Sequence, residues 1–546
     1  MEVKSGIVRG IGISFLFTLL FFLITQKAYH LPFSYGDDHR VLAMMHPEKI
    51  SDSYKTALYG TTPDLKGAWV NDMHVGRFKP LGWAYEDFIG NVFGSDPSVF
   101  RLSKLVILLF SAFFMLGIFT TLGVDWLSAI FVLAFYVFGR NNETWWTLIP
   151  PPQDLGEMFL LGGMYTWLRY RKKGVAGFYA LPALFFLLSG LTKESFNFCI
   201  PLLLVTDYLF FNPSKRIFTK EYLLSAIGSL SVFICLVATI IYVKKVYAYP
   251  YPKSVLYIIG YNAFQFAGAA AFLLAPVVFL FIGRKYIENK IINKIIFIFI
   301  LWTALQLILL KGIMLDDQHH YLIPWLIFPL ILTALALSQI KKTGSKWYTA
   351  MLAVYGLATI VFIRNTYSTC CSYSASLLAY YNMIDAIKID SSAPEIVYLS
   401  NDALEKDWIE GTRAIMDCEG IKQELLFATT LASIPEWEME YASHTRQNAY
   451  KHIALDSVFH ADGKWIILVE SPAKNGSIND DISFYKRSDS SFVKINGTER
   501  YINGAYYYFS VPYPGRSIGD ILRGNFNAEN RKGFYAIKMN SAAKKV

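Results

Sequence analysis

Apolar stretches of about 20 residues recur along the first two-thirds of the chain, and this recurrence constrains the fold more than any other feature. A helix needs about 20 apolar residues to cross a hydrocarbon core roughly 30 Å thick, and about eleven segments approach that length. The segments are 7–25, 104–121, 124–139, 155–169, 176–192, 195–211, 222–243, 257–283, 291–310, 321–339 and 347–363. With 54% hydrophobic and 17% charged residues, the sequence predicts a polytopic α-helical membrane protein. The first segment lacks a small-x-small cleavage pattern behind it, so we expect a retained anchor.

Basic residues mark alternate connections between these segments. Because cytoplasmic loops carry the excess of Lys and Arg, the pattern predicts a cytoplasmic N-terminus, with Lys4 and Arg9. Connections on the same side hold the basic clusters Arg169–Lys173, Lys215–Lys220, Arg284–Lys294 and Lys341–Lys346. Two exceptions are the turn near Gly123, which has no basic residue, and an outer loop with Lys244, Lys245 and Lys253. We therefore expect the remaining loops and the C-terminal part to be extracytoplasmic.

The chain divides into a membrane part and a C-terminal part. Residues 1–365 hold all the apolar segments. Within them, 27–103 form a long first outer loop, where Trp83, Ala84, Phe88 and Val92 recur at helical spacing and predict helices on the membrane surface. Residues 366–546 have mixed composition, with strand-like segments at 395–399, 465–469 and 506–511 and a helical one at 403–416. They predict a soluble extracytoplasmic α/β domain.

Two adjacent carboxylates, Asp37 and Asp38, follow the first apolar segment in the run Phe33-Ser34-Tyr35-Gly36-Asp37-Asp38-His39-Arg40. On the expected topology they lie just outside the bilayer. A carboxylate in that place suits sugar transfer from a lipid carrier, because a base must accept the proton of the acceptor hydroxyl as the anomeric carbon develops oxocarbenium character. The plainer interpretation is an ordinary Gly-Asp turn.

A departing polyprenyl phosphate needs positive charge near the membrane plane. Candidate phosphate-binding residues on the expected outer face are Arg77, Lys193, His319 and His320, and Arg40, Lys79 and Glu194 are supporting candidates. Lys193 stands out, because it lies in a very short connection on the side that the positive-inside rule leaves poor in lysine. Each candidate has an alternative interpretation: a snorkelling Lys193–Glu194 pair, headgroup binding by Arg77 and Lys79, or interfacial histidines.

Metal binding and disulfide formation are left open by the sequence. Asp316, Asp317 and His319 could combine around a divalent cation, Mg²⁺ or Mn²⁺, and Asp38 is a further candidate ligand. Adjacent residues seldom all point at one ion, however. Cys370, Cys371 and Cys418 fall in the outer part, where Cys418 could oxidise with one of the other two. Their spacing predicts no zinc site.

These motifs resemble those of the GT-C superfamily of integral membrane glycosyltransferases, especially bacterial members that modify surface polysaccharide or lipid. Such enzymes carry an acidic pair in the first outer loop, like Asp37-Asp38, an element similar to Arg77-Phe78-Lys79-Pro80-Leu81, and a Lys-Glu at an outer helix junction, like Lys193-Glu194. The resemblance covers residues 1–365 in architecture. The chain departs from the oligosaccharyltransferase branch, because Trp145-Trp146-Thr147 is not followed by Asp-Tyr-Gly.

The resemblance implies inverting transfer from a polyprenyl-phosphate-linked sugar to a hydroxyl of a cell-surface glycan or lipid-linked acceptor. Asp37 or Asp38 would be the base, and Arg77, Lys193 and a histidine of His319-His320 would contact the donor phosphate. It also implies a place in the cell envelope, in a bacterial plasma (inner) membrane. Expected partners are the donor, the acceptor and membrane lipids.

Two other classes of function stay open. A transporter or flippase ordinarily has ionisable residues deep in its spans. Here Asp154 and Glu157 lie near an expected outer edge and Asp207 near an inner one. A non-catalytic envelope assembly protein would account for a displayed C-terminal domain. Nucleic-acid binding is not indicated by the net charge of +9, because much of the excess lies in loops that set topology.

Overall fold

The structure is a computed structural model in which the chain forms two compact units, each assembled from segments that are distant in sequence. It describes residues 2–34, 38–57, 62–74, 79–139, 153–173, 180–193, 196, 234, 255–282, 296–297, 299–304, 307, 323–344, 346–390, 393, 395–400, 406–429, 451–452, 458, 463–472, 477–479, 482–487, 490–495, 498–502, 504–514 and 529–539. The first unit comprises 1–26, 72–86 and 100–367, and the second comprises 27–71, 87–99 and 368–546. Much of the expected first outer loop therefore belongs to the same unit as the C-terminal part.

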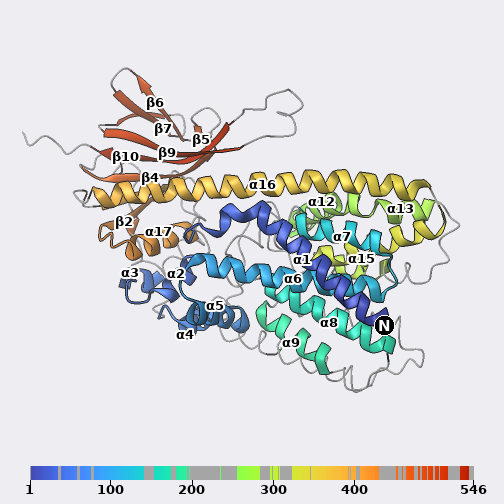
Figure 1. Cartoon of the computed structure of the whole chain (residues 1–546). Helices are drawn as coiled ribbons and strands as arrows, with labels where there is room; N and C mark the ends of the chain where they lie inside the picture. The colour runs from blue at the N-terminus through green and yellow to red at the C-terminus, as the bar shows by residue number, and fades with distance from the viewer. Residues whose placement is uncertain are drawn as a thin grey trace, which may run out of the picture. The chain divides into compact units, whose positions relative to one another are not determined.

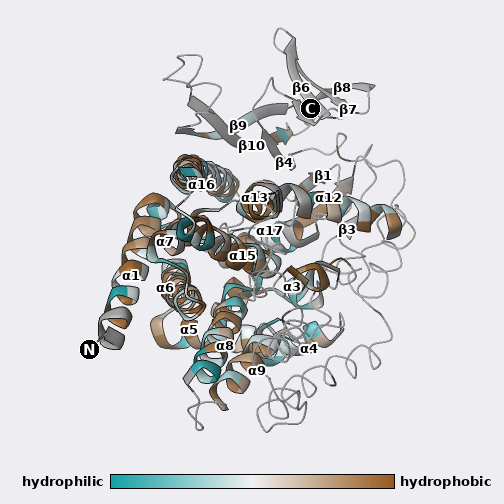
Figure 2. Ribbon diagram, turned by 90° about the vertical axis from the view of Figure 1, so that its right-hand side faces the viewer, coloured by the Kyte–Doolittle hydropathy of each residue, from teal (hydrophilic) through white to brown (hydrophobic). Residues whose placement is uncertain are grey.

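Long apolar helices make up most of the first unit (Figure 1). The long or apolar helices of the chain are α1 (Glu2–Tyr29), α6 (Pro97–Thr121), α7 (Trp126–Phe138), α8 (Gln153–Lys173), α9 (Ala180–Thr192), α12 (Val255–Leu273), α13 (Ala275–Ile282), α15 (Ile323–Lys342) and α16 (Lys346–Ile389). Figure 2 shows apolar residues along much of their length. Four helical stretches in the described residues are long and apolar enough to cross a membrane: Ile7–Tyr29, Pro97–Thr121, Trp325–Lys342 and Lys346–Ile389.

Exposed apolar side chains on α1 agree with a membrane setting. Phe15, Leu19 and Leu23 are among several large hydrophobic residues that stay exposed on this helix. A water-soluble protein rarely leaves so continuous an apolar surface uncovered. The expectation of a helical membrane protein with a C-terminal β-sheet domain is therefore confirmed at this coarse level.

The expected number of about eleven spans is not supported by the described residues. Helices α7 and α9 have 13 residues each, which is short for a hydrocarbon core. The predicted span 257–283 is interrupted at Leu274, between α12 and α13, where the ring of Pro276 removes a backbone donor. Segments 195–211 and 222–243 lie almost wholly outside the described residues. The last predicted span, 347–363, is only the first part of α16, which continues for 44 residues.

Glycines let α8 and α9 approach closely. A Cβ atom added at Gly163 would lie 2.3 Å from the ring of Phe186, and one added at Gly156 would lie 2.7 Å from the ring of Phe196. Ser189 Oγ, on α9, donates a hydrogen bond of 2.7 Å to the carbonyl of Gly156 on α8. Small residues at such crossings allow the backbone contact that drives helix association in membranes.

Short helices accompany the first outer loop. They are α2 (His39–Met45), α3 (Asp52–Ala57), α4 (Leu65–His74) and α5 (Pro80–Phe93). The predicted helical spacing over Trp83 to Val92 is confirmed by α5, in which Trp83 is buried while Phe88 and Val92 are exposed. In the second unit, α17 (Lys406–Cys418) packs against α2 and α3.

The C-terminal part contains two sheets. The strands are β1 (Glu395–Ser400), β2 (Glu424–Thr429), β3 (Lys451–His452), β4 (Trp465–Pro472), β5 (Ser477–Asn479), β6 (Ile482–Arg487), β7 (Ser490–Ile495), β8 (Thr498–Ile502), β9 (Gly504–Pro514) and β10 (Glu529–Met539). The larger sheet has the order β3-β2-β1-β4-β10-β9, and the smaller is the meander β5-β6-β7-β8.

The larger sheet is parallel in one half and antiparallel in the other. β1 pairs in parallel with both β2 and β4, whereas β10 pairs in antiparallel fashion with β4 and β9. The residues Ile396–Leu399 of β1 and Trp465–Ile467 of β4 are buried, as befits central strands. The three predicted strands are confirmed as β1, β4 and β9, and the predicted helix as α17, which is described from Lys406 onward.

Candidate functional site

Asp38 is a buried residue of the second unit and lies at the N-cap of α2. Aspartate at this position ordinarily accepts hydrogen bonds from the first N–H groups of its helix. Here the side chain makes no capping bond. Its Oδ2 instead accepts a hydrogen bond of 2.9 Å from the backbone N–H of Ser34, and the side chain is 1% exposed. The carboxylate is thus held against the preceding loop, away from bulk water.

His39, the next residue, faces a carboxylate of the C-terminal part. Its Nε2 lies 3.5 Å from Oε2 of Glu410 on α17, and both side chains are 1% exposed. The ring of Tyr54 packs edge-on against His39, and its hydroxyl donates a hydrogen bond of 3.4 Å to the His39 carbonyl. At 3.5 Å the two groups form an ion pair when the imidazole is protonated, and each then offsets the cost of burying the other's charge.

Two further contacts join the same loop to α16 and α17. Tyr381, on α16, donates a hydrogen bond of 2.9 Å from its hydroxyl to the carbonyl of Phe33. Its hydroxyl is also close enough to Asp38 for the two groups to interact electrostatically. Asp417, on α17, accepts hydrogen bonds of 2.6 Å from the Ser51 hydroxyl and 2.9 Å from its N–H. Arg413, one turn earlier on α17, pairs with the same carboxylate. The segment that carries Asp38 is therefore tied to C-terminal residues at several points.

Lys79 belongs to the first unit and is a buried partner of Asp72. Its Nζ lies 3.6 Å from Oδ2 of Asp72, and the two side chains are 4% and 3% exposed. The same Asp72 oxygen accepts a hydrogen bond of 2.7 Å from the indole N–H of Trp83, whose ring lies 5.8 Å from the Lys79 ammonium. Asp72 thus neutralises the buried ammonium of Lys79. This ion pair is structural, whereas the supporting role in phosphate binding stays a prediction from the sequence.

Lys193 follows directly after the last residue of α9, also in the first unit. Its Nζ donates a hydrogen bond of 2.5 Å to Oε1 of Gln153, the first residue of α8. The close packing of α8 on α9 explains why these ends meet. The structure thus gives Lys79 and Lys193 different partners, whereas Asp38 and the half-buried Arg40 belong to the other unit.

Asp154 and Glu157, which the sequence placed near an outer edge, are buried together with Lys104, which the sequence did not single out. Lys104 Nζ, on α6, lies 3.9 Å from Oδ1 of Asp154, and both side chains are 1% exposed. Glu157, one turn along α8, is fully buried and adjacent to the hydroxyl of Tyr136. The spacing of Asp154 and Glu157 was a signal in the sequence that both face one side of a helix. Both acids are buried in the membrane part, and buried ionisable residues there are the feature expected of a transporter.

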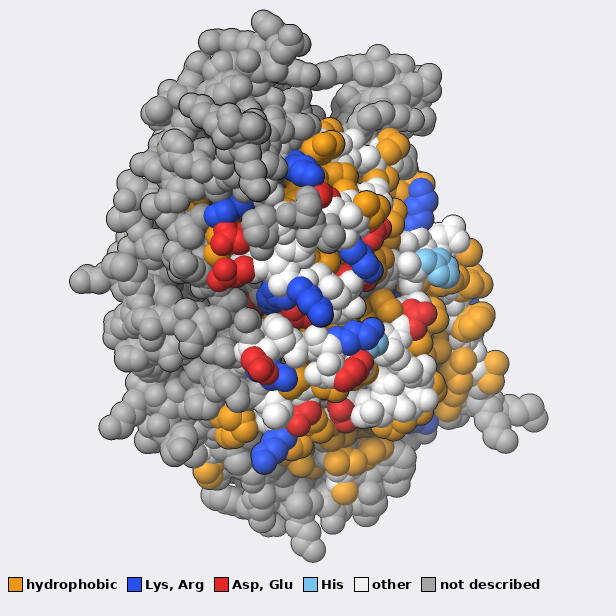
Figure 3. Space-filling model, turned by 90° about the vertical axis from the view of Figure 1, so that its left-hand side faces the viewer, with side chains coloured by type: hydrophobic (Ala, Val, Ile, Leu, Met, Phe, Trp, Pro, Cys, Tyr) orange, Lys and Arg blue, Asp and Glu red, His pale blue; other side chains and the backbone are white. Residues whose placement is uncertain are grey.

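Seven predicted site residues lie outside the described residues. They are Asp37, Arg77, Glu194, Asp316, Asp317, His319 and His320. Among the residues that are described, no group of three or more His, Cys, Asp or Glu side chains is arranged to hold a metal ion. On the face drawn in Figure 3, positive and negative side chains are interspersed among the described residues. Such mixing offers no large surface of one sign there.

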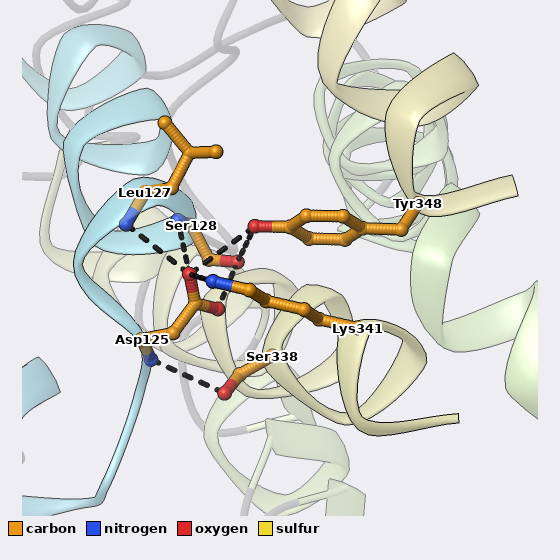
Figure 4. Close-up of polar contacts among 6 residues, drawn as sticks. All are labelled: Asp125, Leu127, Ser128, Ser338, Lys341 and Tyr348. Atoms are coloured by element: carbon orange, nitrogen blue, oxygen red, sulfur yellow. Dashed lines mark hydrogen bonds and ion pairs between the residues drawn. The ribbon is translucent and has the colours of Figure 1, made fainter. Parts of the chain in front are cut away.

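A second polar cluster, at another end of the first unit, joins three helices (Figure 4). Asp125 caps α7 by accepting hydrogen bonds of 3.2 Å from the N–H groups of Leu127 and Ser128. Lys341, at the end of α15, pairs with the same carboxylate at 3.0 Å, and the hydroxyl of Tyr348, on α16, lies at 3.2 Å. Burial alone would raise the pKa of Asp125, but hydrogen bonds from Ser128 and Lys341 outweigh it and hold the pKa below its usual value.

The three described cysteines are thiols rather than a disulfide. Cys370 and Cys371 are buried, and Cys418 is partly buried. Burial raises the pKa of the Cys418 thiol to about 11, although Lys49 acts in the opposite direction. A raised thiol pKa lowers the fraction of thiolate at neutral pH, so nothing here marks Cys418 as a nucleophile.

Sequence comparison adds no family to this description. No protein-family model matches the chain, and no curated protein matches it.

Proposed function

We propose that this protein is a membrane glycosyltransferase that moves a sugar from a polyprenyl-phosphate donor to a hydroxyl of a surface glycan or lipid-linked acceptor. In this reaction the carboxylate of Asp38 takes the acceptor proton, a bond forms between the acceptor oxygen and the anomeric carbon, and the bond from that carbon to the phosphate oxygen breaks. The polyprenyl phosphate leaves with the electron pair, and the anomeric centre is inverted.

The observation that carries this proposal is the state of Asp38. Asp38 is buried at a helix N-cap, but its carboxylate does not cap the helix. Helix stability therefore does not explain why an aspartate occupies this position. General bases are held in this manner, by a few fixed contacts that set the direction of the carboxylate. The candidate membrane span Ile7–Tyr29 ends nine residues before it, which suits a lipid-linked donor.

The direct test is the single substitution Asp38→Asn, which preserves size and removes the base. In membranes that contain the full chain with its natural donor and acceptor, the mass of the surface glycan would lack one sugar unit. General-base catalysis contributes about 10²–10⁴-fold, so the initial rate should fall by at least about 100-fold. The control is Asp52→Asn, because Asp52 is 99% exposed on α3. Equal transfer by Asp38→Asn and wild-type protein, at equal abundance, would exclude Asp38 as the base.

A second function, as a transporter or flippase, is favoured by one specific observation. Lys104, Asp154 and Glu157 are buried together in the membrane unit, and buried ionisable residues there commonly line ion or substrate pathways. The same glycan measurement separates the two functions. A transporter would change how much glycan reaches the surface and leave the mass of each unit unaltered.

A further inference from the structure

We infer that Glu410, in the C-terminal part of the chain, is a positioning residue for Asp38. This inference rests on the proposed function, and it gives the C-terminal domain a role in transfer. Glu410 contacts His39, whose backbone follows Asp38 directly, and both residues belong to the second unit. Glu410 acts through His39 and touches neither substrate.

The contacts around His39 fix its side chain and its backbone from different directions. Glu410 on α17 holds the imidazole at 3.5 Å, and Tyr54 on α3 holds the carbonyl at 3.4 Å. On the other side of Asp38, Tyr381 holds the carbonyl of Phe33 at 2.9 Å. The peptide that carries Asp38 is thus anchored before and after the carboxylate, and two of these anchors come from residues beyond 367.

Of these anchoring residues, Glu410 is the best one to substitute, because its charge can be removed with little change in the size of the side chain. A buried carboxylate 3.5 Å from an imidazole orients that ring by electrostatic attraction when the imidazole is protonated. Loss of the charge loosens His39 and lets the adjacent Asp38 move. A misplacement of about 1 Å at a reacting group lowers a rate by about 100-fold.

Two substitutions at Glu410 distinguish positioning by charge from packing. Glu410→Gln keeps the volume and removes the charge, whereas Glu410→Asp keeps the charge and removes a methylene group. Positioning by charge predicts that Glu410→Gln lowers the transfer rate by roughly 10- to 100-fold and that Glu410→Asp retains more transfer. A residue that only fills space would give the opposite order, because the smaller Asp leaves a cavity.

The matched control is Glu419→Gln, which removes an acid just after the same helix. Glu419 pairs with Lys388 at 2.7 Å in an exposed setting, where such pairs contribute little to stability. All rates are measured on the full chain in membranes, from the mass of the natural surface glycan, and are divided by the amount of folded protein. This normalisation allows the transfer rate of a variant that accumulates poorly to be compared with the others.

The outcomes separate this inference from the function on which it rests. If Asp38→Asn abolishes transfer while Glu410→Gln behaves like Glu419→Gln, Glu410 does not position the base, and the transferase proposal stands. The same holds if Glu410→Gln transfers faster than Glu410→Asp. If Asp38→Asn transfers at the wild-type rate, the transferase proposal itself fails.

Discussion

At the scale of single residues, two aspartates at helix N-caps show how context decides what a side chain does. Asp125 caps α7 in the expected way, whereas Asp38 at the N-cap of α2 turns its carboxylate to Ser34. Both positions look alike in the sequence, since aspartate is favoured at N-caps in general. Asp38 bonds a backbone N–H four residues before it, whereas Asp125 bonds the first N–H groups of its own helix and also pairs with the distant Lys341.

Asp125 allows a prediction about stability. Replacement of an N-cap aspartate by alanine costs about 1 kcal/mol, and Asp125→Ala should lower the unfolding temperature of detergent-solubilised protein at pH 7. The pKa of Asp125 is lowered in the folded state, so its charge stabilises the fold above the ordinary Asp value of about 4. That contribution is lost as the pH falls through the folded-state pKa.

The difference in unfolding temperature between wild-type and Asp125→Ala protein should therefore shrink as the pH is lowered from 7 toward 3. Asp52→Asn, on an exposed helix face, serves as the reference for a change of one acid without a buried contact. A difference that stays constant over this range would show that the charge of Asp125 contributes nothing.

At the scale of helices and strands, apolar patterning predicted the class of fold and the three strands, but not the number or the length of the membrane spans. The runs that became β1 and β4 are rich in Ile, Val and Leu and are buried centrally, so their composition identified them. Helix α16 was underestimated, because its apolar part ends near residue 363 while the helix continues to Ile389. Polar residues in the second half do not interrupt a helix when no proline or glycine breaks it.

The contact between α8 and α9 yields a prediction at this scale. A Cβ atom at Gly163 would lie 2.3 Å from the Phe186 ring, which is itself buried, so Gly163→Ala should destabilise the protein by about 1–3 kcal/mol. Gly12→Ala on α1 is the control, because a Cβ atom there meets nothing within 4 Å. Thermal unfolding in detergent measures both. Equal unfolding temperatures for the two variants would mean that α8 and α9 can separate without loss.

At the scale of the whole molecule, four segments meet at one end of the first unit. Arg9 lies over the ring of Trp126, Lys172 donates to the carbonyl of Thr121, and Lys341 pairs with Asp125. All three cations come from segments for which the positive-inside rule predicts the cytoplasmic side. The turn near Gly123, which has no basic residue of its own, joins them there. The three cations expected on the cytoplasmic side thus lie at the same end of this unit, and the side that this end faces stays a prediction.

Labelling from one side of the membrane tests that topology. In a background without the five native cysteines, single cysteines at exposed Lys172 and Thr343 should react with a membrane-impermeant thiol reagent only after the membrane is opened. A cysteine at exposed Asp96, in the expected outer loop, should react in intact cells. Reaction of Lys172→Cys in intact cells would reverse the assignment.

The sequence singled out residues for the candidate site but not their partners. The acidic pair after the first apolar segment drew attention to Asp38, and the short junction to Lys193, because both signals are local; their roles stay predictions. The contacts of His39 with Glu410 and of Lys104 with Asp154 join residues with no shared local pattern. No spacing rule reports a pair that forms only when distant helices pack.

Composition and apolar periodicity by themselves determined that this chain is a helical membrane protein with a C-terminal α/β part, because hydrophobic segments and strand-forming runs act over a few turns or residues. Only the tertiary structure decided that the loop after α1 belongs with the C-terminal part in one unit, and that Asp154 is buried beside Lys104. Those outcomes depend on which surfaces pack together, and a buried charge must find an opposite charge wherever the chain brings one.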